Sequence, residues 1–340
     1  MMNSFGEFRK EKRSLLGLKN NQIDDRTPSY LQDSLTSFKD LAELGKNLKP
    51  KRKVFGDYVH ENCVCHFPSE RGSGKTLFGL QLCMAVSGNF KSYCDENIEL
   101  NGNTLFLNCE LNQDDLARRM AFLWKNGPKE IEQYTPYEAS ALTTRKSIFS
   151  IEDKVVGTIK DKEPVLLVID NWTIAFQEAD GNDKKKITEM IIKLLNLKDQ
   201  YKFSILMVDH LRKGSSFKLT DSDLQSGSGA KTDLSDQDMF LRKTTDKQNR
   251  LLMRRKSRNA SEQGHGKAKL LFLDPDSLWF NCLQEEVNEQ DHIDFGTMKN
   301  DKEDLARYAG MMKQEGKTYK EISMILGHPI STIERWIKNK

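Results

Sequence analysis

The sequence has no run of eighteen apolar residues, so it predicts no segment that spans a membrane. The N-terminal stretch carries charged residues but no apolar core, and we therefore expect no secretory signal peptide. A strong charge of one sign is also missing, because the formal net charge is only +3. Affinity for nucleic acid would have to come from local clusters of basic residues rather than from the chain as a whole.

Cysteine is scarce, with six residues in 340. Cys63, Cys83 and Cys109 lie in apolar patterns, as reduced core cysteines do, so we expect a cytoplasmic protein without disulfides. Cys65 and His66 beside Cys63 could suggest a metal site. Alternate residues of a strand point to opposite faces, and no second ligand pair follows at a zinc-like spacing, so a metal cluster is disfavoured.

The chain divides into four parts by composition. Residues 1–50 are a polar extension in which apolar residues from Tyr30 to Leu48 recur at helical spacing, as in a helix that docks on the core or on a neighbouring subunit. Residues 51–285 alternate strand and helix patterns. Residues 286–302 form an acidic linker, and residues 303–340 form a small helical unit.

The alternation in residues 51–285 predicts an α/β fold with a mostly parallel, twisted sheet. Apolar runs of this kind are typical of strands that are buried on both faces of such a sheet. The expected strands are 63–67, 104–108, 164–169, 203–208, 251–253 and 269–273, the last two possibly antiparallel. The expected helices are 75–88, 112–125 and 187–197.

Residues 68–76 read Pro-Ser-Glu-Arg-Gly-Ser-Gly-Lys-Thr and carry the strongest functional signal. They lie between an expected strand and an expected helix, which is the setting of a P-loop that binds ATP with Mg²⁺. Lys75 would reach the β- and γ-phosphates, and Thr76 would contact the metal ion. The remaining nucleotide-binding residues would be Arg71, Gly72, Ser73 and Gly74. The pattern departs from a full P-loop at its first position, where Ser69 replaces glycine.

Two carboxylates follow apolar strands downstream of this loop. Asp170 ends the strand 164–169, where an acid holds Mg²⁺ in the Walker B arrangement. The next residue, Asn171, is not an acid, so the carboxylate that activates water must come from elsewhere. Glu110, just after the strand 104–108, is the candidate base. A helix N-terminal acid is the alternative interpretation of Glu110.

The order of P-loop, Glu110, Asp170 and a strand ending in Asp209-His210 resembles the RecA-type ATPases. Within them it is closer to the hexameric-helicase branch that includes DnaB and plasmid RepA. The resemblance covers roughly residues 55–285. It implies a RecA-like fold, ATP hydrolysis, and assembly of identical subunits into a hexamer-like ring or a filament.

The resemblance also implies roles for particular residues. Glu110 would be the catalytic base, and Arg119 would pack on the adenine. His210 would sense the γ-phosphate, although Asp209 stands where the family has a first histidine. Lys256 and Arg258 resemble the basic pair that reaches the γ-phosphate of the neighbouring subunit, and an arginine finger of this kind raises hydrolysis rates by roughly 10³–10⁵.

The segment from Leu211 to Asp236 resembles the loop that lines the central channel of such rings and holds single-stranded DNA. Its basic residues Lys213, Lys218 and Lys231 could neutralise phosphates. Phe217 is its one aromatic residue, which leaves little scope for stacking on bases. A surface loop without a ligand remains an equal alternative.

Residues 303–340 predict three helices with a Gly-containing turn before the last one, which is the helix-turn-helix layout. The last helix would enter the major groove of duplex DNA and present Thr332, Arg335 and Lys338 to it. The expected small core consists of Ile322, Leu326, Ile333 and Trp336. A helical unit for subunit contacts is the alternative.

Together these patterns predict a helicase-like, DNA-stimulated ATPase that acts in replication, recombination or a mobile element. The first alternative is a DNA-binding regulator of transposition or phage defence that ATP switches and that has no helicase activity. The second is a P-loop protein that binds nucleotide only as a structural ligand, which the departures at Ser69 and Asn171 keep open.

Overall fold

The computed structural model describes residues 36–129, 131, 137–177, 184–210, 234–257, 268–293, 302–314 and 316–338. The chain forms two compact units, Met1–Leu48 and Lys49–Lys340. In the first unit, helix α2 (Phe38–Asn47) begins after Ser37, whose hydroxyl accepts a hydrogen bond from the Asp40 amide at 3.1 Å. None of the residues of α2 is buried, and residues 30–35 of the expected docking helix lie outside the described residues.

The second unit is built on a nine-stranded sheet with the order β13-β12-β11-β10-β3-β9-β8-β6-β7. Neighbouring strands from β10 to β7 are parallel, and those from β10 to β13 are antiparallel. The parallel strands are β3 (Val64–Ser69), β6 (Thr104–Asn108), β7 (Ala139–Thr143), β8 (Leu166–Asp170), β9 (Ser204–His210) and β10 (Gln237–Lys243). The antiparallel ones are β11 (Asn249–Ser257), β12 (Ala268–Leu273) and β13 (Phe280–Val287). The predicted α/β fold with a mostly parallel sheet is confirmed.

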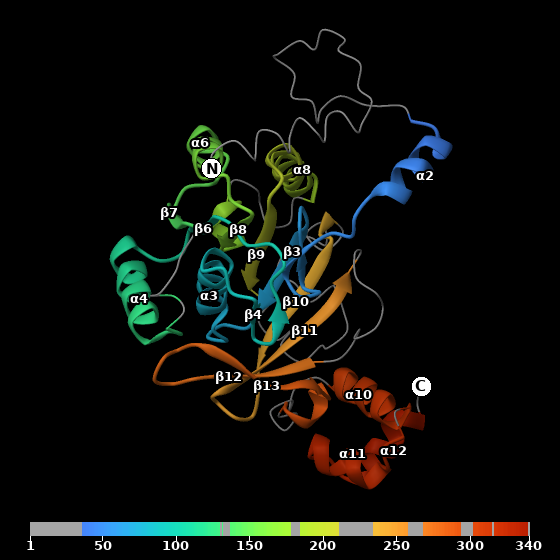
Figure 1. Cartoon of the computed structure of the whole chain (residues 1–340). Helices are drawn as coiled ribbons and strands as arrows, with labels where there is room; N and C mark the ends of the chain where they lie inside the picture. The colour runs from blue at the N-terminus through green and yellow to red at the C-terminus, as the bar shows by residue number, and fades with distance from the viewer. Residues whose placement is uncertain are drawn as a thin grey trace. The chain divides into compact units, whose positions relative to one another are not determined.

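Helices cover both faces of the parallel strands (Figure 1). Helices α3 (Lys75–Ser87) and α4 (Gln113–Asn126) pack on one face, while α6 (Glu152–Lys162), α7 (Trp172–Ala175) and α8 (Lys184–Tyr201) pack on the other. The strands divide their side chains by alternation: in β8, Leu166 and Val168 join the first core, and Leu167 and Ile169 join the second. Burial on both faces explains why these strands have no polar alternation in the sequence.

The sequence located most of the elements of the sheet and missed three of its strands. Each expected strand and helix overlaps an observed one, and the expected antiparallel pairing of the later strands is confirmed. Strands β7, β10 and β13 and helix α6 were not expected, because polar or charged residues interrupt their apolar runs. Strands β7 and β13 are the two edge strands, and α6 buries only Val155 and Ile159. Strand β10 lies inside the sheet but carries the buried polar residues Gln237, Asp238 and Arg242.

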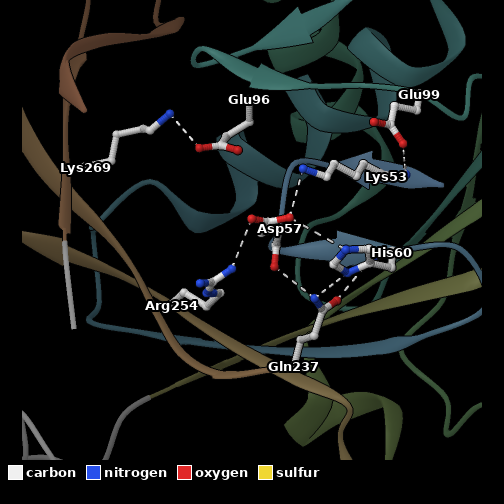
Figure 2. A network of polar contacts seen from close by, with 8 residues as sticks. All are labelled: Lys53, Asp57, His60, Glu96, Glu99, Gln237, Arg254 and Lys269. Carbon is white, nitrogen blue, oxygen red and sulfur yellow. Dashed lines mark hydrogen bonds and ion pairs between the residues drawn. The ribbon is translucent and has the colours of Figure 1, made fainter. Parts of the chain in front are cut away.

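Two short hairpins flank the sheet, β1–β2 (Lys53–Phe55 and Val59–His60) and β4–β5 (Ser92–Tyr93 and Glu96–Asn97). Figure 2 shows the polar network that joins them to β10–β12. Asp57 pairs with Lys53 at 3.0 Å and with Arg254 of β11 at 3.4 Å, and its carbonyl oxygen accepts a hydrogen bond from Gln237 at 2.9 Å. Lys269 of β12 pairs with Glu96 at 2.6 Å.

The C-terminal helices are α10 (Lys302–Gln314), α11 (Tyr319–Leu326) and α12 (Ile330–Lys338). Thr318 and Glu321 form a capping box at the start of α11, and Gly327 ends it with a φ of 65°, a left-handed conformation that favours glycine. The four expected core residues are buried together with Leu305, Ala309 and Met312 of α10. Of the predicted linker, residue 287 ends β13 and Glu289–Asp291 form a short 3₁₀ helix, η3.

None of the helices in the described ranges has the length and apolar character needed to cross a bilayer.

Candidate nucleotide site

The predicted P-loop connects β3 to α3, and two of its glycines adopt left-handed main-chain conformations. Gly72 and Gly74 have φ values of 70° and 98°, in the left-handed region where a side chain would be strained. Gly74 caps α3 without any side-chain hydrogen bond, and no acidic residue occupies the first helical turn. The positive end of the helix dipole is therefore available to an anion, while within the loop the Ser73 amide donates to the Glu70 carbonyl oxygen at 3.3 Å.

The serine at the first P-loop position fits its place. Ser69 is the last residue of β3 and pairs with His210 in the sheet register. Its φ is not among the positive values of the chain, so this position does not require glycine. The main chain therefore accommodates the departure from the full P-loop pattern, although the Ser69 hydroxyl is buried without a hydrogen-bond partner among the described residues.

Two buried arginines support the loop from the antiparallel half of the sheet, and the sequence did not single them out. Arg250 of β11 donates to the Ser73 carbonyl oxygen at 2.7 Å. Arg242 of β10 pairs with Glu289 at 2.7 Å and with Glu70 at 3.5 Å. Their signal in the sequence was weak, since a basic residue in a strand is usually solvated.

Asp170 lies at the end of β8, fully buried, and neither of its carboxylate oxygens has a hydrogen-bond partner among the described residues. Burial raises the pKa of Asp170 to about 6. The Thr76 hydroxyl, which lies nearby outside hydrogen-bonding geometry, opposes this rise, as does the ammonium group of Lys75. Buried oxygen atoms without partners beside a threonine hydroxyl form the donor set that Mg²⁺ prefers, so Asp170 and Thr76 fit this ion.

Lys75 is the first residue of α3 and is buried beside these groups. Burial lowers its pKa below the usual range, against the raising effect of the carboxylates of Asp170, Glu110 and Asp209. The convergence of three carboxylates on one lysine shows that the strand ends meet at a single site. Arg119, half-buried on α4, also lies within electrostatic reach of this site, because its charge lowers the pKa of Asp170.

The sheet register brings the predicted base and sensor together. Asn108 of β6 pairs with Asp170 of β8, so Glu110 and Asn171 leave neighbouring strands at the same edge. The Asn171 side-chain amide donates to Glu110 Oε2 at 2.7 Å. His210 Nε2, from the end of β9, lies 3.8 Å from the same oxygen and 3.4 Å from the Asn171 amide nitrogen.

The electrostatics of His210 favour a neutral ring. Burial and the charge of Lys75 lower the pKa of His210, while Glu110 and Asp209 act in the opposite direction. The ring is therefore neutral near pH 7, with one nitrogen able to donate and the other able to accept.

The contacts of Asp209 explain why an aspartate stands where the resembling family has a first histidine. Its Oδ1 accepts a hydrogen bond from the His210 amide at 2.8 Å, and its Oδ2 lies 3.3 Å from Nε2 of the fully buried His66. Asp238 of β10 lies 4.0 Å from the other nitrogen of His66. Asp209 thus orients the strand end that carries His210 and does not face an open site.

The family model described as AAA domain matches residues 27–216, which is more than half of the chain. The chain belongs to the AAA domain family. A search of curated protein sequences finds no match. Among solved structures, a KaiC-like protein from the hyperthermophilic archaeon Pyrococcus horikoshii is similar, with 16% identity, a TM-score of 0.48, and coverage of 69% of this chain and 97% of that chain.

The AAA domain match contains the P-loop, Glu110, Asp170 and His210, all of which the structure gathers at one edge of the sheet. Membership of this family supports nucleotide-driven activity in general, with ATP and Mg²⁺ as the expected ligands.

Several predicted residues fall beyond what the structure describes. Lys213, Lys218, Lys231 and Arg258 lie outside the described residues, and for Lys256 only the main chain in β11 is described. Arg254, next to them in the basic cluster, is buried against Asp57. On α12, outside the AAA domain match, Arg335 and Lys338 are exposed and Thr332 is half-buried.

Proposed function

We propose that this protein is a DNA-associated ATPase that works as a ring or filament of identical subunits. The observation that supports it best is the convergence of Lys75, Asp170, Glu110 and His210 at one sheet edge, next to a P-loop with its helix dipole free. Phosphate-binding, metal-binding and basic groups thus lie within one another's electrostatic reach. Five buried cysteines also suit a cytoplasmic location, where thiols stay reduced.

The first step is binding. The amides of residues 72–76 and the ammonium of Lys75 would hold the β- and γ-phosphates, and the Arg250 contact would keep the loop in shape. Mg²⁺, when bound by Thr76 and Asp170, supplies neutralisation of the phosphate charge. Arg119, on α4, would pack on the adenine.

In hydrolysis, Glu110 accepts a proton from water, whose oxygen forms a bond to the γ-phosphorus. The bond between that phosphorus and the bridging oxygen breaks, and ADP leaves with the electron pair. The Glu110 side chain is 42% exposed, so water can reach it. His210, neutral and 3.8 Å from Glu110, would register the loss of the γ-phosphate.

The neighbouring subunit would complete the site with Lys256 and Arg258. The loop 211–236 would hold single-stranded DNA, and α12 would bind duplex DNA through Thr332, Arg335 and Lys338. A core of its own supports the C-terminal unit as a separate binding module, and the exposed basic residues of α12 suit phosphates.

The decisive experiment measures ATPase rates with no DNA, with single-stranded DNA and with duplex DNA, beside the mass of the ATP-bound assembly. We expect stimulation by DNA and an oligomer. A monomer whose rate ignores DNA would overturn the proposal. Glu110→Gln is expected to abolish hydrolysis while ATP still binds.

The second candidate function is a DNA-binding regulator that ATP switches. The well-formed C-terminal core favours it, since a module of this type can recognise duplex DNA without unwinding it. Strand displacement separates the two candidates: a helicase unwinds a forked duplex in an ATP-dependent manner, and a regulator does not. If Lys75→Ala left assembly and DNA binding unchanged, nucleotide would be only a structural ligand.

A further inference from the structure

The proposed hydrolysis step assigns no role to Asn171. This residue follows Asp170, is only 3% exposed, and precedes the short helix α7. Its Oδ1 accepts a hydrogen bond from the Ile174 amide at 3.1 Å, as an N-cap residue does. Because the oxygen is held by the helix, the NH₂ group of the side chain must face the other way, toward the nucleotide site.

That NH₂ group meets the hydrolytic carboxylate. Its nitrogen donates to Glu110 Oε2 at 2.7 Å and lies 3.4 Å from His210 Nε2. An amide carries two N–H bonds, so one side chain can serve both groups. Within the described parts of the chain, Asn171 is the one side chain that donates a hydrogen bond to Glu110.

We propose that Asn171 is the positioning residue for Glu110, holding one carboxylate oxygen so that the other is directed at water. This inference rests on the proposed role of Glu110 as the base. The Cys109 amide donates to the Asp170 carbonyl oxygen at 2.6 Å, which fixes the two strand ends relative to each other. The main chain thus fixes the position of the Glu110 backbone, and the Asn171 hydrogen bond fixes the position of the carboxylate at the end of its half-exposed side chain.

The position also explains why an acid would be unsuitable there. A carboxylate at residue 171 could cap α7 equally well but would oppose the Glu110 carboxylate at hydrogen-bond distance. Asparagine keeps the cap and adds a neutral donor. Its presence after Asp170 therefore fits an active site in which the base comes from the neighbouring strand.

The test separates the cap from the donor. Asn171→Ser retains an N-cap oxygen and removes the amide, so we expect kcat for ATP to fall about 10- to 100-fold, with the Kd for ATP within about twofold. Asn171→Asp retains size and cap but replaces the donor with an acceptor, and its loss of kcat should be larger. Asn112→Ser, at the exposed N-cap of α4, is the matched control and should leave kcat unchanged.

A double-mutant cycle identifies the route of the effect. Glu110→Asp keeps a carboxylate but shortens it beyond the reach of the amide, so Asn171→Ser in that background should change kcat by less than about threefold. A full 10- to 100-fold loss in that background would overturn the inference, because Asn171 would then act without Glu110.

Three further results have distinct meanings. If Asn171→Ser kept its kcat while Glu110→Gln was inactive, Asn171 would not be the positioning residue, although the proposed function would stand. If Glu110→Gln remained active, the proposed function and this inference would both fail. If an Asn171 variant had a lower ATP affinity and a lower urea-unfolding midpoint as well as a lower kcat, the role of Asn171 would be structural instead.

Discussion

The guanidinium of Arg250 donates to the main-chain carbonyl oxygen of Ser73 at 2.7 Å, so a strand of the antiparallel half of the sheet supports the phosphate-binding loop. The same guanidinium also donates to the carbonyl oxygens of Lys247 and Asn249. One buried side chain therefore joins the β10–β11 turn to the P-loop. The P-loop is therefore supported by a residue that lies 177 positions away from Ser73 in the sequence.

Arg250→Ala removes this support and leaves three carbonyl oxygens without their donor. We expect the free energy of unfolding to fall by about 2–4 kcal/mol and the Kd for ATP to rise at least about tenfold. Arg250→Lys keeps the charge but not the forked geometry, so its stability and its ATP affinity should lie between those of the native chain and of Arg250→Ala. Calorimetric titration with ATP and urea unfolding provide the measurements. Unchanged ATP affinity in a destabilised protein would show that Arg250 does not shape the loop.

Asp170→Asn should stabilise the protein at neutral pH in the absence of nucleotide and divalent cations. The pKa of Asp170 is about 6 in the folded chain against an ordinary value of 3.8, so stability linked to its protonated form is complete below about pH 4 and is lost as the pH rises through 6. Above pH 7 the variant should gain about 3 kcal/mol over the native chain, and near pH 4 the difference should disappear.

Urea unfolding in EDTA at pH 8 and at pH 4 tests the Asp170 prediction. Asp161→Asn on α6 is the control, because that side chain is 73% exposed and should show no such pH dependence. A less stable Asp170→Asn protein at pH 8 would mean that a favourable contact of the ionised carboxylate outweighs the cost of its burial.

Arg335→Glu should weaken binding to duplex DNA at least about tenfold and lower the slope of log Kd against log salt concentration by about 1, because one phosphate contact is lost. The ATPase rate without DNA should not change. Lys160→Glu alters the net charge by the same amount at an exposed position of α6 in the ATPase core and is the matched control. Equal effects of both substitutions on DNA binding would indicate a general charge effect.

Arg254 and Arg258 belong to one basic cluster in the sequence but should behave differently. Arg254 is buried and pairs with Asp57, so Arg254→Ala should cost about 2 kcal/mol of stability, a value reduced by the partial exposure of Asp57. Arg258→Ala should leave the unfolding midpoint unchanged and lower ATPase activity only in the assembled protein. Mixing Arg258→Ala subunits with Lys75→Ala subunits should restore some activity if Arg258 acts on a neighbour; no recovery at any ratio would contradict that role.

The sequence predicted the centre of the fold well because the central strands are buried on both faces and are almost wholly apolar, as in Leu166–Asp170. It predicted that Asp170 and His210 lie near the P-loop for a related reason, because the carboxyl ends of parallel strands meet at one edge of the sheet.

The supporting residues could not be found in this way. Arg242 and Arg250 lie far along the chain from Glu70 and Ser73, and no local pattern relates them. At position 171 the sequence shows only that no acid follows Asp170. Its role depends on the rotamer that the cap of α7 imposes, which is a property of packing and not of spacing.

The cysteines have a practical consequence. Burial raises the pKa of the thiols of Cys63, Cys83 and Cys109 to about 12 and that of the half-buried Cys282 to about 11, and it raises those of Cys65 and Cys94 as well. At pH 7.5 a thiol of pKa about 11 is ionised several-hundredfold less than an ordinary exposed thiol. A cysteine introduced on the surface, for example on α12, would therefore react with a fluorescent maleimide long before the native ones. Movements during ATP turnover could then be followed in the otherwise unaltered chain.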